Sequence, residues 1–261
     1  MLNIKPISAF NDNYIWCLYD TETKEALLVD PGDANAALSF LNAEKLKLSH
    51  ILITHHHPDH IGGVNKLKQH FACKTVGFSQ ANYQGVDIAL SECSSIALLS
   101  ITFKIIEVPG HTLDHIAFYA AKQGAIDTPL LFCGDTLFSA GCGRLFEGTP
   151  AQMLNSLDKF KLLPEATLIY CAHEYTLANL NFVTALLPNN SDVAAYRTLC
   201  ENKRAQGHAT IPTTLGNECR INPFLGSERH EIATAAQAFT GTLETDPLSV
   251  FAAIRKAKDS F

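Results

Sequence analysis

Short runs of apolar residues, each closed by a turn residue, alternate with helical patterns up to residue 173. Runs with the length and composition of β-strands cover 14–20, 25–32, 48–55, 73–78, 102–111, 115–121, 129–135 and 167–173. Apolar residues at helical spacing cover 33–44, 60–71 and 149–160, and the first of these segments begins with Asp33, a residue type favoured at helix N-caps. This mixture predicts two sheets, or one folded sheet, with helices packed outside.

The pattern changes after residue 173, where helical spacing replaces the strand-like runs. Helical segments are predicted over 174–187, 192–207, 230–239 and 247–261, with a long irregular connection over 208–227. We therefore predict an α+β chain in two parts. A larger domain covers residues 1–172, and a small α-helical domain covers residues 173–261.

Composition limits the class of protein further. Of 261 residues, 47% are hydrophobic and 18% are charged, which is typical of a folded globular chain. The formal net charge of −6 argues against a general nucleic-acid-binding protein, because such proteins are usually basic. No stretch approaches the length of a membrane span, and the first residues lack the apolar core of a secretory signal. The eight scattered cysteines form no CxxC pair and favour a reduced, cytoplasmic protein over a disulfide framework.

The segment THHHPDH, residues 54–60, places several metal-binding side chains at the end of an apolar run. Alternation at a strand end points His55 and His57 the same way, and the following turn brings Asp59 and His60 to a neighbouring point. Imidazole nitrogen and carboxylate oxygen are ligands for zinc, iron and manganese. The segment therefore predicts part of a metal site.

Three further polar residues follow apolar runs in the same way. His111, Asp135 and His173 each come directly after a predicted strand and a small or turn residue. Because side chains at the ends of neighbouring strands can converge at one edge of a sheet, we expect these three to join the first four. Seven candidate ligands are too many for one zinc ion and suit two metal ions that share a bridging carboxylate.

Other polar residues near these motifs have more than one interpretation. His56 falls between ligands, and we expect it to point elsewhere, into a hydrogen bond behind the site. His115, Asp30 and Asp114 either orient ligands or serve at strand starts, caps and turns. No role is assigned to the isolated histidines His70, His208 and His230.

With these motifs, the chain resembles the metallo-β-lactamase superfamily, whose H-x-H-x-D-H signature stands at residues 55–60. Within that superfamily it is similar to the glyoxalase II, or hydroxyacylglutathione hydrolase, family over most of its length. The likeness rests on NDNYIWCLYD (11–20), THHHPDHIGG (54–63), VPGHT (108–112), FCGDTLFSAGCGRLFEGT (132–149), YCAHEYTLANLNF (170–182), NPFL (222–225) and IRKAKDSF (254–261). The resemblance implies an αββα sandwich followed by a helical domain.

The resemblance also implies two divalent metal ions, zinc in the first place, with iron or manganese as alternatives. All of the family's ligands are present: the first ion corresponds to His55, His57 and His111, the second to Asp59, His60 and His173, and the bridge to Asp135.

Glutathione-binding positions of the family correspond to Arg144, Phe146, Tyr175, Arg255 and Lys258. Arg144 stands where Lys is frequent, which keeps the charge but changes its reach and geometry. Phe146 stands where Tyr is frequent, so a phenolic hydrogen bond to the peptide is lost.

The activity implied by the resemblance is hydrolysis of the thioester of an S-(2-hydroxyacyl)glutathione. With S-D-lactoylglutathione the products are D-lactate and glutathione, the second step of methylglyoxal detoxification. A hydroxide held between the two metals attacks the carbonyl, and Asp59 orients it. We expect this small thioester as the partner, with no nucleic acid and no membrane, and a monomer in the cytoplasm.

Other functions are also compatible with the sequence. Another hydrolase of the superfamily would share the ligand motif, although Asp135 stands where β-lactamases usually have Cys. A persulfide dioxygenase with a single iron resembles the catalytic domain but is usually shorter at the C-terminus, where this chain carries IRKAKDSF. A non-enzymatic metal-binding protein is disfavoured, because the complete ligand set comes with a matching substrate tail.

Overall fold

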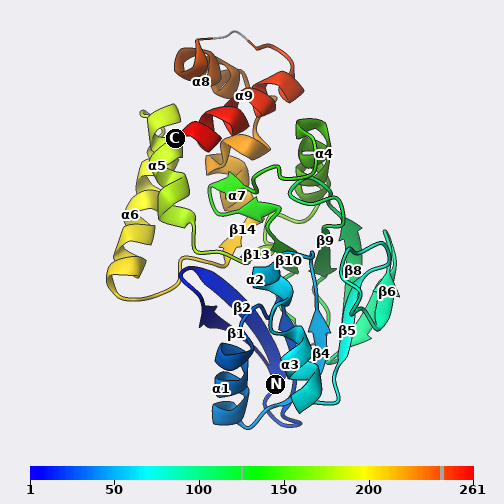
Figure 1. Ribbon diagram of the computed structural model, residues 1–261. Helices are drawn as coiled ribbons and strands as arrows, with labels where there is room; N and C mark the ends of the chain where they lie inside the picture. The colour runs from blue at the N-terminus through cyan, green and yellow to red at the C-terminus, as the bar shows by residue number, and fades with distance from the viewer. Residues whose placement is uncertain (125, 242–243) are drawn as a thin grey trace.

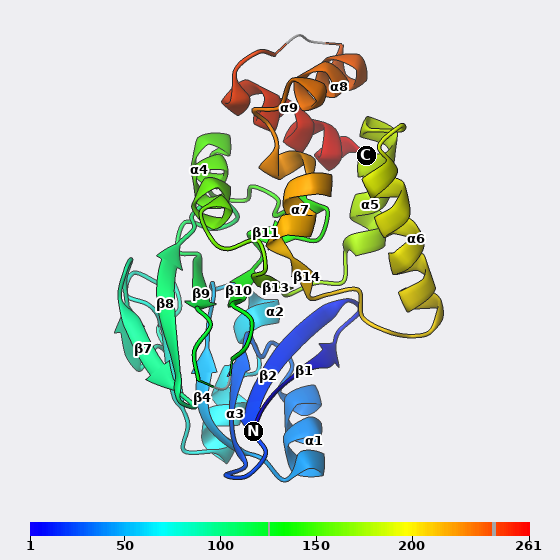
Figure 2. The ribbon, with the colours of Figure 1, turned by 180° about the vertical axis from the view of Figure 1, so that it is seen from behind.

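Two six-stranded β-sheets form the centre of the molecule in the computed structural model, which describes residues 1–124, 126–241 and 244–261 (Figures 1 and 2). The first sheet contains, in spatial order, β1 (Leu2–Ala9), β2 (Asn13–Asp20), β3 (Glu25–Val29), β4 (Lys47–Leu52), β5 (Lys74–Phe78) and β6 (Ile88–Leu90). The second contains β14 (Thr213–Thr214), β13 (Leu168–Cys171), β10 (Leu130–Gly134), β9 (Ile116–Ala120), β8 (Ile101–Glu107) and β7 (Ser95–Leu98).

Alternation along the strands builds two cores on opposite faces of the first sheet. Trp16 on β2 belongs to the large buried cluster that includes Phe118 of the second sheet, so this cluster lies between the sheets. Cys17, the next residue, belongs to a second cluster with Leu41 and Leu67. These two leucines lie on α1 (Ala34–Glu44) and α3 (Val64–His70), which cover the outer face of the first sheet (Figure 1). The predicted αββα arrangement is confirmed.

Helical crossovers join parallel strands in both sheets and bring their carboxyl ends to one edge. In the first sheet, α1 connects β3 to β4, and its N-cap Asp33 accepts hydrogen bonds from the backbone N–H groups of Asn35 and Ala36, as predicted. In the second sheet, α4 (Pro150–Lys161) connects β10 to β13 and begins with a capping box at Thr149. Loops that leave these strand ends therefore meet between the two sheets.

The chain after residue 173 is mainly helical, as predicted, and lies at one end of the sandwich (Figures 1 and 2). It contains α5 (Thr176–Leu186), α6 (Ser191–Ala205), α7 (Leu215–Ile221), the 3₁₀ helix η1 (Pro223–Leu225), α8 (His230–Thr240) and α9 (Pro247–Ser260). It also contributes β14, which pairs antiparallel with β13 at the edge of the second sheet. A strand of two residues is too short to leave a periodic pattern in the sequence.

The remaining features of the fold agree with the composition. All eight cysteines lie within the described residues and are free thiols. Across those residues, no helix is both long enough and apolar enough to cross a bilayer.

Candidate metal centre and substrate cavity

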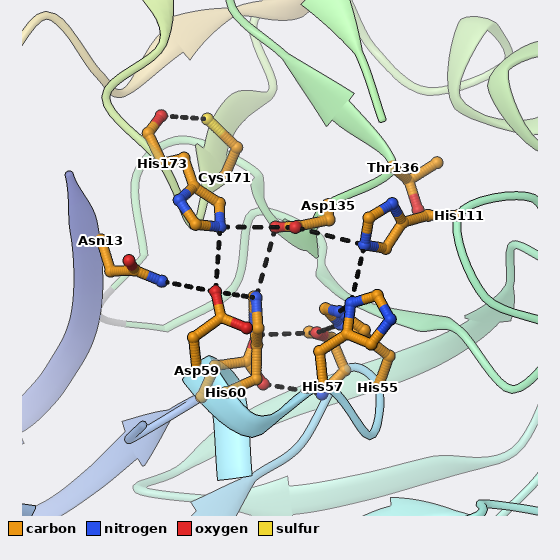
Figure 3. Close-up of polar contacts among 12 residues, drawn as sticks. Asn13, His55, His57, Asp59, His60, His111, Asp135, Thr136, Cys171 and His173 are labelled. Carbon is orange, nitrogen blue, oxygen red and sulfur yellow. Dashed lines mark hydrogen bonds and ion pairs between the residues drawn. The ribbon is translucent and has the colours of Figure 1, made fainter. Parts of the chain in front are cut away.

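All seven predicted ligands lie together at the edge where the two sheets meet (Figure 3). His55 and His57 follow β4, and Asp59 and His60 lie on the short helix α2 (Pro58–Ile61). The other three follow strands of the second sheet: His111 after β8, Asp135 after β10 and His173 after β13. The predicted convergence of strand ends therefore describes the observed geometry.

The turn Asp30–Pro31–Gly32 packs directly against the backbone of α2. A Cβ atom at Gly32 would lie 1.8 Å from the carbonyl oxygen of Asp59, so only glycine allows the turn to pack this closely. Asp30 accepts a hydrogen bond from the Thr54 hydroxyl at 2.7 Å and faces Nδ1 of His60 at 3.0 Å. Two roles were left open for Asp30, and the structure shows that it orients the ligand candidate His60.

Three imidazole nitrogens form the first group of donors. Nδ1 of His57 lies 3.1 Å from Nε2 of His55 and 3.0 Å from Nε2 of His111. The ligand atoms of all three residues lie within 4.8 Å of one another, close enough for one metal ion to bind all three. The other nitrogen of His111 contacts the carbonyl oxygen of Arg144 at 2.8 Å, which fixes the orientation of the ring.

A carboxylate and two imidazoles form the second group. Oδ2 of Asp59 lies 3.5 Å from Nε2 of His60 and 3.4 Å from Nε2 of His173. Asp135 stands between the groups: its Oδ1 is 3.5 Å from Nε2 of His60, and its Oδ2 is 3.3 Å from Nε2 of His173 and 3.4 Å from Nε2 of His111. Asp135 therefore lies within 3.5 Å of nitrogens from both groups.

Two buried atoms show that these residues fit metal ions. Nε2 of His60 and Oδ1 of Asp135 have no hydrogen-bond partner among the described residues, although both are buried. Leaving buried polar atoms without a hydrogen bond is costly in a folded protein, and a divalent cation bound by both residues would satisfy them.

The two groups of donors differ in protonation. Burial lowers the pKa of His55, His57 and His111, so their nitrogens have free lone pairs at neutral pH. Burial also acts to lower the pKa of His173, but the carboxylates of Asp135, Asp59 and Asp12 together outweigh it and raise this pKa to about 10. The same balance, with Asp135 as the main charge, raises the pKa of His60. Metal binding at the second group is therefore coupled to proton release from His60 and His173.

Two residues at the start of β2, Asp12 and Asn13, contact the second group of donors. Neither was predicted from the sequence as part of the site. Asp12 Oδ1 lies 2.7 Å from Nδ1 of His173, and the Asn13 amide donates to Oδ2 of Asp59 at 2.9 Å. The backbone of Asn13 also forms an isolated bridge with His173. The available signal was the polar NDN turn at 11–13, which lies inside a stretch already singled out for its family likeness.

His56 and His115 lie behind the ligands in different ways. His56 points away from the ligand cluster, and its two nitrogens contact Asp114 Oδ1 at 2.8 Å and Glu147 Oε1 at 3.3 Å. His115 is buried, and its Nε2 accepts a hydrogen bond from the backbone N–H of Asp135 at 3.1 Å. Both histidines thus fix loops that carry ligands.

A cavity of about 590 Å³ opens directly onto the ligands. Its wall includes all five positions matched to glutathione binding: Arg144, Phe146, Tyr175, Arg255 and Lys258. The Tyr175 ring stacks on His173 with centroids 4.6 Å apart, whereas the Phe146 ring is exposed at the rim, edge-on to His57.

The three cations of this wall have different surroundings. Arg255 is almost fully buried and donates to the carbonyl oxygen of Cys142 at 2.9 Å. Asp259 accepts from both arginines, at 2.9 Å from Arg255 and 3.2 Å from Arg144. Burial lowers the pKa of Lys258, whose ammonium lies over the Phe182 ring at 5.7 Å. The cavity therefore joins a set of metal ligands to a cationic wall.

Comparison with known proteins gives a consistent result over the whole chain. Residues 14–173 match the model of the metallo-beta-lactamase superfamily, and residues 174–261 match that of the hydroxyacylglutathione hydrolase C-terminus. Proteins named hydroxyacylglutathione hydrolase from Hahella chejuensis and Albidiferax ferrireducens are 48% and 46% identical over 261 residues, with both chains fully covered.

Solved structures show the same fold at lower identity. The B3 metallo-beta-lactamase BLEG-1 has a TM-score of 0.61 and 26% identity, covering 86% of this chain and 99% of its own. ETHE1 from Myxococcus xanthus has a TM-score of 0.65 and 22% identity, covering 100% of this chain and 99% of its own. At this identity, the second likeness concerns the fold alone.

Proposed function

The chain belongs to the hydroxyacylglutathione hydrolase family, and we propose on this basis that it hydrolyses the thioester of an S-(2-hydroxyacyl)glutathione to a 2-hydroxy acid and glutathione. The observation that carries the proposal is the single cavity that joins the metal ligands to Arg144, Arg255 and Lys258. With S-D-lactoylglutathione as substrate, the acid released is D-lactate, which would place the enzyme second in methylglyoxal detoxification.

We propose that the seven ligands hold two divalent ions, most simply zinc, with iron or manganese as alternatives. When bound, such ions supply a hydroxide at neutral pH and a Lewis acid for the carbonyl oxygen, because coordination lowers the pKa of water to about 7. The imidazole donors of His55, His57 and His111 suit a metal such as zinc at the first position. Metal analysis of protein purified from cells, with activity restored by each metal separately, tests the identity.

The chain's own residues would orient the nucleophile and the substrate. Asn13 holds one carboxylate oxygen of Asp59, which leaves the other free to accept a hydrogen bond from the attacking water. Arg144 and Lys258 carry positive charge at the cavity wall and match the carboxylates of glutathione. Phe146 offers an apolar edge but no hydroxyl, so the peptide is held through the cations and Tyr175. Binding the peptide in this way places the thioester beside the ligands.

We also propose that the enzyme acts as a monomer in the cytoplasm. One chain supplies both the ligands and the α9 cations of the cavity, so no second copy is needed to complete it. Free thiols at all eight cysteines are typical of a reducing compartment. Light scattering after size exclusion, and fractionation of cells, test the two statements.

The decisive experiment uses metal-loaded protein with S-D-lactoylglutathione, following loss of the thioester and appearance of free thiol. We expect both at equal rates. Retention of two metals without hydrolysis would contradict the proposal. Oxygen uptake with glutathione persulfide would identify an iron dioxygenase instead, and hydrolysis of a β-lactam or lactone without the thioester would identify another hydrolase of the superfamily.

A further inference from the structure

A small hairpin lies between the metal ligands and the cationic wall. It consists of β11 (Leu137–Phe138) and β12 (Gly141–Cys142), joined by the two-residue turn Ser139–Ala140. The hairpin begins two residues after Asp135 and ends two residues before Arg144. Phe138 and Cys142 line the substrate cavity. Its position therefore sets where one side of the cavity stands.

Side chains from the C-terminal helices bind the backbone of this hairpin at every residue from Phe138 to Cys142. The contacts are Asn222 Nδ2 to Phe138 O at 3.2 Å, Asn179 Nδ2 to Ser139 O at 3.0 Å, Ala140 N to Glu218 Oε2 at 2.7 Å, Asn222 Nδ2 to Gly141 O at 3.0 Å and Arg255 Nη1 to Cys142 O at 2.9 Å. The donors and acceptor come from α5, α7, the residue after α7, and α9, so four separate points of the helical region converge on five residues.

Glu218 is the centre of these contacts. It is fully buried, and besides the Ala140 N–H it accepts from the Ser139 hydroxyl at 3.2 Å and from Asn222 at 3.1 Å. A buried carboxyl group is costly unless hydrogen bonds surround it, and an apolar residue would fill the same space more cheaply. We therefore explain the presence of Glu218 by its hydrogen bonds to the hairpin turn and not by its packing.

The turn that Glu218 holds is conformationally demanding. Ala140 has a φ of 57°, in the left-handed region that a residue with a Cβ adopts unwillingly. A Cβ at the next residue, Gly141, would lie 2.5 Å from the Asn179 amide nitrogen, so the helical region approaches the turn as closely as glycine permits. We call the hydrogen bonds of Glu218, Asn179 and Asn222 to this hairpin the clamp. Without the clamp, we expect the turn to relax and the side chains of Phe138 and Cys142 to shift.

We propose that Glu218, supported by Asn179 and Asn222, is a positioning residue for the reaction: it fixes the 137–142 hairpin and thereby the substrate-binding wall of the catalytic domain. The inference rests on the proposed function. It gives the helical region a second role, because the hairpin that it holds belongs to the catalytic domain. Of the side chains that hold it, only Arg255 is also a predicted glutathione-binding position.

The first test replaces Glu218 by alanine and compares it with Ile232→Ala, a matched change that removes a fully buried side chain from α8 without touching the hairpin. For Glu218→Ala we expect KM for S-D-lactoylglutathione to rise about tenfold, with kcat within about threefold and metal content unchanged. For Ile232→Ala we expect lower thermal stability and an unchanged KM. Equal KM changes in the two variants would overturn the inference.

Two further variants separate positioning from a general structural role. Glu218→Gln keeps an acceptor for the Ala140 N–H and should bring KM back to within about threefold of the parent chain. Ala140→Gly removes the conformational penalty of the turn, so in the Glu218→Ala background it should recover most of the lost affinity. Additive effects of Ala140→Gly and Glu218→Ala would contradict the clamp.

Failure of the proposed function would look different. If the parent chain holds its metals but does not cleave the thioester, the proposed function falls, and this inference with it. If the parent chain cleaves the thioester and the variants show no KM pattern, only the hairpin inference falls. Should Glu218→Ala not fold, Ser139→Ala removes the hydroxyl donor to the carboxyl group and is expected to raise KM by about twofold; an unchanged KM there would also overturn the inference.

Discussion

The two walls of the substrate cavity are built by different means. We call the side formed by the predicted metal ligands the ligand wall; His57, Asp59, His111, Asp135 and His173 line the cavity there. These residues follow strand ends, and the histidines are largely buried. Asp12 and Asp30 contact the ring nitrogens of His173 and His60 and fix the orientation of these rings. The cationic wall consists of loop and helix side chains, and two of its members are open to solvent, Arg144 at 58% of its side chain and Phe146 at 62%. Rigid placement suits a metal centre, where small displacements are costly, whereas a peptide with several rotatable bonds tolerates a looser wall.

The difference also assigns separate kinetic roles to the walls. Changes on the ligand wall should act on metal content and kcat, because those residues act at the reacting bond. Changes on the cationic wall should act on KM, because they bind a part of the substrate that does not react. Four substitutions test this division, and the expected effects decrease from the first to the last.

Asp135→Ala should have the largest effect. It removes a carboxylate that contacts His60, His111 and His173 together. We expect kcat/KM to fall by at least about a thousandfold and bound metal to fall with it. Steady-state kinetics and elemental analysis measure both. Asp158→Ala, at an exposed position of α4, is the control. Retained activity in Asp135→Ala would refute the proposal that Asp135 bridges two metals.

Asp12→Ala should weaken the second metal position by about ten- to a hundredfold, because His173 loses the partner that orients its ring. The first position, which Asp12 does not contact, should keep its affinity. Chelator competition resolves the two steps. Asp20→Ala, which removes a partly exposed turn carboxylate at the opposite end of β2 from Asp12, is the control. Equal weakening of both positions would show that the two groups are not independent.

Lys258→Ala should raise KM about tenfold and leave kcat within about threefold, since the lysine lies at the cavity wall and not at the ligands. Lys256→Ala provides a matched control on the same helix, because Lys256 lines a different cavity. If Lys258→Ala lowers kcat and leaves KM unchanged, the division between the walls is wrong.

Phe146→Tyr should have the smallest effect and the opposite sign. The added hydroxyl can donate to the bound peptide, and because the ring is exposed at the rim we expect KM to fall by only about two- to threefold. Phe10→Tyr, at another exposed phenylalanine, should leave KM unchanged. A rise in KM for Phe146→Tyr would mean that the ring edge packs against the substrate.

The ligand wall could be predicted from sequence because its chemistry and its structural context coincide. His111, Asp135 and His173 each follow an apolar run, and the order of strands in the chain leads them to one edge. The helix N-cap at Asp33 was predictable for a similar reason: a local pattern fixes a local structure.

Contacts between distant segments could not be predicted in this way. Asp12 and His173 are 161 residues apart, and Glu218 and Ala140 are 78 apart, so no periodicity connects them. The pattern also missed six strands that the structure describes: β1, β6, β7, β11, β12 and β14. Of these, β1 lies at a sheet edge and contains Pro6, and β14 has two residues, so neither has the continuous apolar run of a central strand.

The short strand β14 has a consequence for how the protein is made. During synthesis β13 leaves the ribosome well before residues 213–214, and until they arrive one side of β13 has no backbone partner. The nascent second sheet therefore has an unpaired, apolar border, the kind of surface that recruits other chains. An enzyme truncated after His173 would be left in that state permanently, so the helical region cannot be treated as a detachable accessory when fragments or fusions are designed.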